Sequence, residues 1–304
     1  MSPVPPKIVA LLVASLFFGS AMAAPVGYIV NSDGPNADAD SLFEVDLATG
    51  DVNLIGKLQN QLEDVEGLAM ASDGRLYAAD DATDTVFVLS RTNASAALFS
   101  TGVSNLAIGG NPNGDYGLAF GCQGQLYMSS DTNQTLYTVD LDSGAATVVG
   151  ANGGLNAPIS GIAVSADGVF GLGALGAQSL FRIDPDAGTA TEIGPLGLNF
   201  DFEDAGLAFD ADGTLWGVAD RRSASVDGSP SVIFQIDVET GAASRIAETI
   251  IGVESLAIAP PPCGGAPTPA ALPVPSLNVW LQALLALLVG GVAWLRLRPG
   301  ASLS

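Results

Sequence analysis

The sequence predicts an all-β fold, a five-bladed β-propeller, and two observations favour it. First, a short apolar strand with the pattern Gly-Leu-Ala, or a close variant, recurs along the chain. Second, the copies recur at a nearly constant spacing, and no amphipathic helical pattern occurs before residue 276. The copies begin at residues 67, 117, 161, 206 and 255, with separations of 50, 44, 45 and 49 residues. A period of this size, made only of short strands, is typical of propellers.

Each repeat contains four strand-like segments. In the clearest copy, residues 206–209 form the first strand, an Asp-Gly turn follows at 212–213, and residues 215–218 return as the second strand. The third strands alternate apolar and polar residues and lie at 42–46, 86–89, 136–140, 180–184 and 233–237. A turn ending in glycine then leads to a fourth strand such as 146–149, and residues 93–95 replace this turn in the first unit.

The two ends of the repeat region together supply one further unit. Residues 27–30 resemble a second strand without a first, and residues 255–259 a first strand without a second. Pairing these N- and C-terminal strands completes a fifth four-stranded blade and leaves no open edge. A linear β-solenoid is the alternative, but it leaves both partial units unexplained. The propeller is therefore predicted over residues 24–259.

The N-terminus is expected to be a secretory signal peptide over residues 1–23. Lys7 supplies the positive charge, residues 8–18 form the apolar run, and Ala-Met-Ala at 21–23 is a small-residue cleavage site. A transmembrane anchor is the alternative, but this apolar run is short for one.

Three segments follow the propeller. Residues 260–275 contain seven prolines and are expected to form an extended linker. Residues 276–298 are expected to form one C-terminal transmembrane helix, because residues 279–295 hold a single polar side chain, Gln282. Two tryptophans at the ends of this stretch and two arginines after it favour a cytoplasmic C-terminus. Residues 299–304 are a short tail.

The end of the chain resembles the bacterial C-terminal sorting signals of the IPTL type, relatives of the PEP-type exosortase signals. The family pattern is Ile-Pro-Thr-Leu-Ser-x-Trp, then a hydrophobic helix and a basic end. Pro275, Leu277 and Trp280 match it, whereas Val274 and two polar residues replace the Ile, Thr and Ser. The resemblance implies a Gram-negative bacterium and a sorting or processing protease at the envelope. A plain single-pass anchor is the alternative, and both place the propeller outside the cytoplasm.

The charge and composition exclude several classes of function. All 32 acidic residues lie within 24–259, together with seven of the ten basic residues. Such a surface repels nucleic acid and anionic lipid, so no nucleic-acid partner is expected. The chain has no histidine, which removes Ser-His-Asp triads and most zinc sites.

The two cysteines, Cys122 and Cys263, are expected on the same face of the propeller. In an exported chain they can form a disulfide, which would tie the linker across the channel and brace the closing strand. Two free thiols or an intermolecular bridge are the alternatives.

Acidic residues are expected to gather at one mouth of the channel, because loops before first strands and after second strands share a face. The acids at these positions are Asp64, Glu66, Asp115, Glu203, Asp204, Glu254, Asp80, Asp81, Asp131 and Asp220. Converging carboxylates suit a hard cation such as Ca²⁺. The predicted metal ligands are Asp64, Glu66, Asp115, Asp204 and Glu254, and the predicted binding residues are Glu66, Asp115, Glu203, Asp204 and Glu254. The alternative is that these acids cap turns and keep the face soluble.

The repeats over residues 26–259 resemble those of the NHL and SMP-30/gluconolactonase type, in which a Gly-Leu-Ala strand is innermost. In the SMP-30-like family an acid just before the innermost strand binds the catalytic metal, and Glu66 resembles it in position. The third unit departs from this pattern, with Ser160 and Leu175 in place of acids.

Two hypotheses for the function follow. The first is an exported propeller at the cell envelope that binds a ligand or an envelope component without catalysis. The second is a Ca²⁺-dependent hydrolase or lactonase with its site at the acidic mouth. The absence of a histidine and of a nucleophile–base pair favours the first.

Overall fold

The computed structural model describes residues 25–264, except 33–38, 60–61, 63, 98–105, 107–113, 151–153, 175 and 222–228. The predicted signal peptide, the linker beyond Gly264, the transmembrane helix and the tail lie outside the described residues. In the part that is described, no helix has the length and apolar character needed to cross a membrane.

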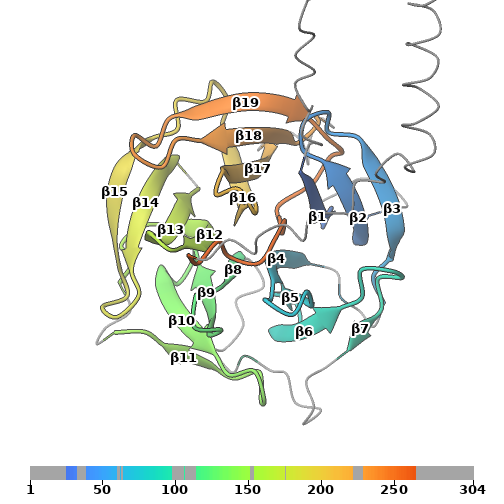
Figure 1. Ribbon diagram of the computed structural model, residues 1–304, viewed down its shortest axis with the longest axis horizontal. Helices are drawn as coiled ribbons and strands as arrows, with labels where there is room; N and C mark the ends of the chain where they lie inside the picture. The colour runs from blue at the N-terminus through green and yellow to red at the C-terminus, as the bar shows by residue number, and fades with distance from the viewer. Residues whose placement is uncertain are drawn as a thin grey trace, which may run out of the picture.

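Five antiparallel sheets stand around a central axis, which confirms the predicted five-bladed propeller (Figure 1). Blade 1 contains β4 (Val65–Met70), β5 (Leu76–Asp80), β6 (Thr85–Leu89) and β7 (Ala96–Ala97). Blade 2 contains β8 (Tyr116–Phe120), β9 (Leu126–Ser130), β10 (Thr135–Val139) and β11 (Ala146–Val148). Blade 3 contains β12 (Ile159–Ser165), β13 (Gly168–Gly173), β14 (Ser179–Asp184) and β15 (Thr189–Pro195). Blade 4 contains β16 (Phe202–Phe209), β17 (Leu215–Arg221), β18 (Val232–Ile236) and β19 (Ala243–Glu248).

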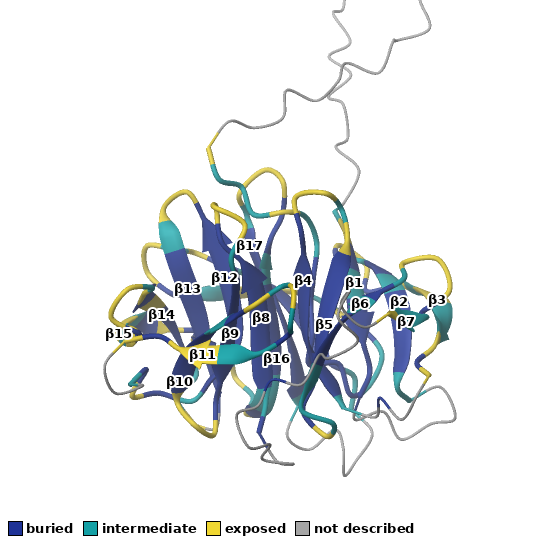
Figure 2. Cartoon of the chain, turned by 90° about the horizontal axis from the view of Figure 1, so that it is seen from below, coloured by how far each residue is buried: buried dark blue, intermediate teal, exposed yellow. Residues whose placement is uncertain are grey.

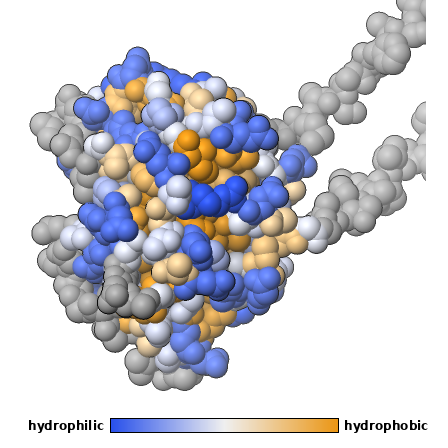
Figure 3. All heavy atoms as spheres, turned by 90° about the vertical axis from the view of Figure 1, so that its left-hand side faces the viewer, coloured by the Kyte–Doolittle hydropathy of each residue, from blue (hydrophilic) through white to orange (hydrophobic). Residues whose placement is uncertain are grey.

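Burial decreases from the axis to the rim of each blade (Figure 2). The strands β4, β5, β8 and β9 are buried along their whole length, because neighbouring blades cover both of their faces. The third strand β14 alternates buried and exposed residues toward its end, as the sequence pattern predicts. The outer strands β3 (Val52–Lys57) and β19 are mostly exposed or half-buried. The side of the ring that carries β15 accordingly shows many hydrophilic side chains around smaller apolar areas (Figure 3).

The repeated glycine lies where the inner strands of neighbouring blades approach each other. A Cβ atom at Gly117 would lie 2.5 Å from the Ser160 carbonyl oxygen of blade 3. At Gly206 it would lie 2.4 Å from the backbone nitrogen of Leu256. Any side chain here would therefore push adjacent inner strands apart, which explains why this position is glycine in four of the five copies.

The fifth blade is formed from both ends of the propeller, as the sequence predicts, but with less pairing than expected. It contains β1 (Val26–Val30), β2 (Ser41–Asp46), β3 and a closing segment, residues 253–259. The closing segment forms one antiparallel bridge, between Tyr28 and Ala257, instead of a full strand. Two features limit the pairing. The Val30 N–H donates to the Ser255 hydroxyl, 3.1 Å away, instead of to a backbone carbonyl. The prolines from residue 260 onward lack the N–H that a longer ladder needs.

Five aliphatic side chains close the central channel. They follow the repeat glycine or its serine counterpart and are Leu68, Leu118, Ile162, Leu207 and Leu256. Each is at most 3% exposed. The space that they line next to Glu66 is about 10 Å³, close to the minimum for one water molecule. The two ends of the channel are therefore separate environments.

The turn at residues 93–95 was expected to differ from the glycine turns of the other units. In the structure it has the same conformation as those turns. Ala94 has a φ of 54°, and its N–H donates to the Ser90 carbonyl oxygen at 3.0 Å. Gly144 in blade 2 makes the equivalent bond to Asp140 at 2.7 Å. Blade 1 thus makes the same turn with alanine in a left-handed conformation, which the interpretation of residues 93–95 missed.

Candidate functional site

Buried carboxylates gather at one end of the channel, next to the apolar ring. A β-bulge in blade 1 lets this happen: Val65 and Gly67 pair with consecutive residues of β5, so Glu66 is the extra residue. A second bulge lies between Phe202 and Ala205 of β16 and contains Glu203 and Asp204. Bulges redirect side chains out of the regular alternation, and here both contain acids.

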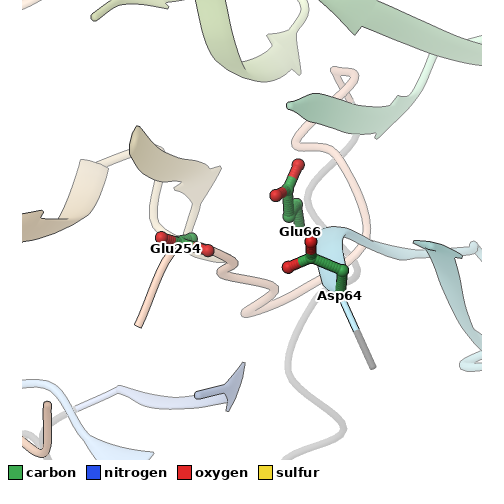
Figure 4. Close-up of side chains that lie close together, drawn as sticks. All are labelled: Asp64, Glu66 and Glu254. Carbon is green, nitrogen blue, oxygen red and sulfur yellow. The ribbon is translucent and has the colours of Figure 1, made fainter. Parts of the chain in front are cut away.

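The first carboxylate group consists of Asp64, Glu66 and Glu254. One oxygen from each lies within 4.8 Å of the others. Glu254 belongs to the closing segment and faces the two acids of blade 1 across the space at this end of the channel (Figure 4). The Tyr116 N–H donates to Glu66 Oε2 at 3.1 Å, and the Ser32 hydroxyl donates to Glu254 Oε2 at 3.0 Å.

The second carboxylate group consists of Asp115, Asp131 and Asp204, again with one oxygen each within 4.8 Å of the others. The Asp115 N–H donates to Asp131 Oδ1 at 2.8 Å, so Asp131 also holds the start of β8. The Asp115 carboxyl group forms hydrogen bonds with those of Asp204 and Glu66. The two groups therefore adjoin, and the single set of ligands expected from the sequence is divided between them.

Asp81 was expected on this face but not among the ligands, and it lies beside the first group. It is 2% exposed. It forms a hydrogen bond with Asp64, and its charge acts on Glu66. Its Oδ1 atom is buried and has no hydrogen-bond partner. The signal for it in the sequence was its position directly after a second strand, which Asp131 shares.

Asp80 and Glu203 take different places. Asp80 Oδ2 accepts the Asp64 N–H at 3.2 Å, and its Oδ1 accepts the Thr83 N–H at 2.7 Å, so Asp80 is engaged with the backbone. Glu203 is half-buried and belongs to neither carboxylate group among the described residues. Asp220 is also separate and accepts the Ser231 hydroxyl at 3.4 Å.

Burial and neighbouring charges raise the pKa values of Glu66, in the first group, and of Asp81 beside it. Burial, then the charges of Asp115 and Glu254, hold the pKa of Glu66 well above its usual range. Burial and the charge of Asp64 raise the pKa of Asp81 to about 8. Without a cation, these side chains keep protons at pH values where ordinary carboxyl groups are ionised.

Asp115 and Asp204 of the second group shift in the same direction. Burial raises the pKa of Asp115 to about 6, and burial with the Asp115 carboxyl group raises the pKa of Asp204 to about 11. Exposed turn acids behave in the opposite way, since the Ser143 N–H lowers the pKa of Asp140. The shift is therefore specific to the channel end and is not general to this acidic chain.

The first group fits a hard cation, and Asp81 lies beside it. All four side chains offer carboxylate oxygens, the type of ligand that Ca²⁺ takes in proteins. The unpartnered Asp81 Oδ1 is a buried acceptor that lacks a donor, and a cation would satisfy it.

The opposite end of the channel carries a disulfide between Cys122 and Cys263, with Cα atoms 5.3 Å apart. Cys122 lies in the turn between β8 and β9, and Cys263 follows prolines 260–262. The Pro262 carbonyl oxygen accepts the Ala166 N–H from the β12–β13 turn at 3.0 Å. The start of the linker therefore crosses this end of the ring (Figure 1).

Comparison of the sequence with family models gives one match. Residues 110–255 match a family described as a repeat of unknown function (DUF6923). Among curated proteins, no match to this sequence was found.

Solved structures with a similar arrangement include enzymes and a protein complex. An inactive virginiamycin B lyase from Staphylococcus aureus with quinupristin is 15% identical, with a TM-score of 0.42 and 68% of this chain covered. The chain spans 63% of the length of that lyase. A gluconolactonase from Xanthomonas campestris is 14% identical, with a TM-score of 0.44 and coverage of 75% of this chain and 77% of its own. A chain of a nidogen/laminin complex is 14% identical, with a TM-score of 0.43 and coverage of 73% and 78%.

Proposed function

We propose that this chain is an exported propeller that binds a ligand or an envelope component without catalysis, and that a bound Ca²⁺ completes its binding site. The observation that carries the proposal is the buried Asp81 Oδ1 atom, which lacks a partner beside three converging carboxylates. An unpaired buried acceptor costs about 1–3 kcal/mol, and a cation beside it would remove that cost.

The residues that would hold the cation are Asp64, Glu66, Asp81 and Glu254. The ion would supply positive charge that neutralises these carboxylates, and coordination positions open to an oxygen-containing ligand. The Ser32 hydroxyl and the Tyr116 N–H orient Glu254 and Glu66 by donating to one oxygen of each.

The location at the cell envelope belongs to the same proposal. The predicted signal peptide at 1–23 and the predicted helix at 276–298 would export the propeller and anchor it until any processing by a sorting protease. The disulfide supports this location, since such bonds persist in oxidising compartments and are rare in the cytosol.

A calcium titration tests the proposal. Full-length protein stripped with a chelator is titrated with Ca²⁺ by calorimetry, together with Asp81→Asn and Asp212→Asn. Asp212 is an exposed acid of the β16–β17 turn, so it serves as the matched control. We expect binding to the parent and to Asp212→Asn, and a loss of at least tenfold in affinity for Asp81→Asn. Equal affinities for the parent and Asp81→Asn would contradict the assignment.

A Ca²⁺-dependent hydrolase or lactonase is the second candidate, and one observation favours it. Asp115 adjoins the first group and has a pKa of about 6, which suits a general base near neutral pH. Turnover of a panel of lactones and esters separates the two candidates. Hydrolysis that Ca²⁺ supports and Asp115→Asn abolishes would establish catalysis, whereas binding of Ca²⁺ without turnover favours the first candidate.

A further inference from the structure

The closing segment connects the two ends of the channel. Glu254 contributes to the first carboxylate group, Leu256 completes the apolar ring, and Cys263 forms the disulfide at the opposite end. One short segment therefore carries an acid of the first carboxylate group, a member of the apolar ring and a cysteine of the disulfide.

Few hydrogen bonds hold the closing segment to its own blade. The backbone of Tyr28 exchanges two hydrogen bonds with that of Ala257, at 2.7 and 3.0 Å, and Ser255 accepts the Val30 N–H. By comparison, β4 and β8 each pair with the next strand at five positions. The segment that carries Glu254 thus has the least backbone pairing of the five innermost segments in the described propeller.

The disulfide supplies an attachment that the missing ladder does not. It joins Cys263 to Cys122 of blade 2, and the carbonyl oxygen of Pro262 is also bound by blade 3. From Cys122, β8 runs back to Tyr116, whose N–H donates to Glu66. The disulfide therefore links two innermost segments whose other ends both reach the first carboxylate group.

Building on the cation site proposed above, we propose that the Cys122–Cys263 disulfide keeps Glu254 in the first carboxylate group, so that its reduction weakens cation binding at the far end of the channel. A dithiol breaks the S–S bond by supplying two electrons and two protons, which yields two cysteine thiols and one oxidised dithiol. Cys122 is exposed and Cys263 is half-buried, so we expect a dithiol to reach the bond. In part of the population the released segment then separates from β1, and Glu254 moves with it.

The loss of Ca²⁺ affinity depends on the fraction of reduced molecules in which Glu254 stays in the first carboxylate group. If Glu254 stays in place in about one tenth of the reduced molecules, the apparent affinity for Ca²⁺ falls about tenfold. Glu254→Gln lacks the charge that the segment contributes, so reduction should cost this variant little further affinity. The double variant Cys122→Ser with Cys263→Ser should match the reduced parent and ignore dithiothreitol.

The experiment measures Ca²⁺ affinity of the full-length protein by calorimetry, oxidised and after dithiothreitol, for the parent and these variants. Hydrogen exchange of the Tyr28 and Ala257 amides, measured without Ca²⁺, gives a readout that does not depend on the cation site. We expect faster exchange at both amides after reduction, with β12 amides unchanged.

Equal Ca²⁺ affinities before and after reduction would overturn the proposal, as would a tenfold loss that persists in Glu254→Gln. Fast exchange throughout β12 would also overturn it, because reduction would then unfold the whole propeller. If the oxidised protein binds no Ca²⁺, the proposed cation site is wrong and the affinity effect falls with it. The exchange rates at Tyr28 and Ala257 then still show whether the disulfide holds the closing segment.

Discussion

Raising the pH should destabilise the cation-free protein, and Asp81 is the residue that allows the effect to be calculated. Its pKa is about 8 in the fold, against an ordinary value of 3.8. Between these values the folded state holds a proton that the unfolded state has released. The stability from this group is complete below the unfolded-state pKa and is lost as the pH rises toward the folded-state pKa.

The magnitude follows from the proton difference. One extra proton in the folded state gives a loss of about 1.4 kcal/mol per pH unit, so the proton that Asp81 shares with Asp64 accounts for up to about 3 kcal/mol between pH 5.5 and 7.5. The raised pKa values of Glu66 and Asp204 act in the same direction. Asp81→Asn cannot titrate, so its loss over this range should be smaller by that amount.

Urea unfolding followed by circular dichroism, in chelator at pH 5.5, 6.5 and 7.5, measures this loss. A saturating concentration of Ca²⁺ should remove most of it, because the cation replaces the protons among the carboxylates. A cation-free parent that is as stable at pH 7.5 as at pH 5.5 would refute the argument. So would an Asp81→Asn variant with the same pH dependence as the parent.

Four further changes have defined outcomes. Gly206→Ala should destabilise the fold by about 1–3 kcal/mol in urea unfolding, because the new Cβ meets the Leu256 backbone; unchanged stability would contradict the close contact between blades. Ser255→Ala should lower the stability by about 1–3 kcal/mol in the same assay, because it leaves the Val30 N–H without its acceptor. Unchanged stability would show that this hydrogen bond does not help to hold the fifth blade closed. Trp216→Phe should cost about 1–3 kcal/mol, because its indole N–H donates to the buried Asp210 at 2.9 Å; equal stability would show that water replaces the bond. Residues 260–304 fused to an exported reporter should place it in the membrane fraction, and a soluble reporter with an intact tail would contradict the predicted anchor.

Most of the fold could be predicted from the repeat in the sequence alone. The Gly-Leu-Ala pattern, the glycine turns and the alternation in the third strands identify local conformations that each segment adopts largely by itself. The partial units at residues 27–30 and 255–259 also indicated that both ends share one blade. Pairing at a single bridge was not predictable, because the Ser255 hydroxyl takes the place of a backbone acceptor only once the blade has closed.

The candidate site depended on the tertiary structure to a greater degree. The sequence placed the acids on one face, since strand order alone decides which loops share an end of a propeller. It did not assign them to two groups, nor did it separate Asp81, which contacts the first group, from Asp80, which binds the backbone. Those assignments depend on β-bulges at Glu66 and Asp204 and on the burial of each oxygen. Each bulge forms within one blade, but the grouping and burial of the acids need side chains from different blades, and no single repeat contains those contacts.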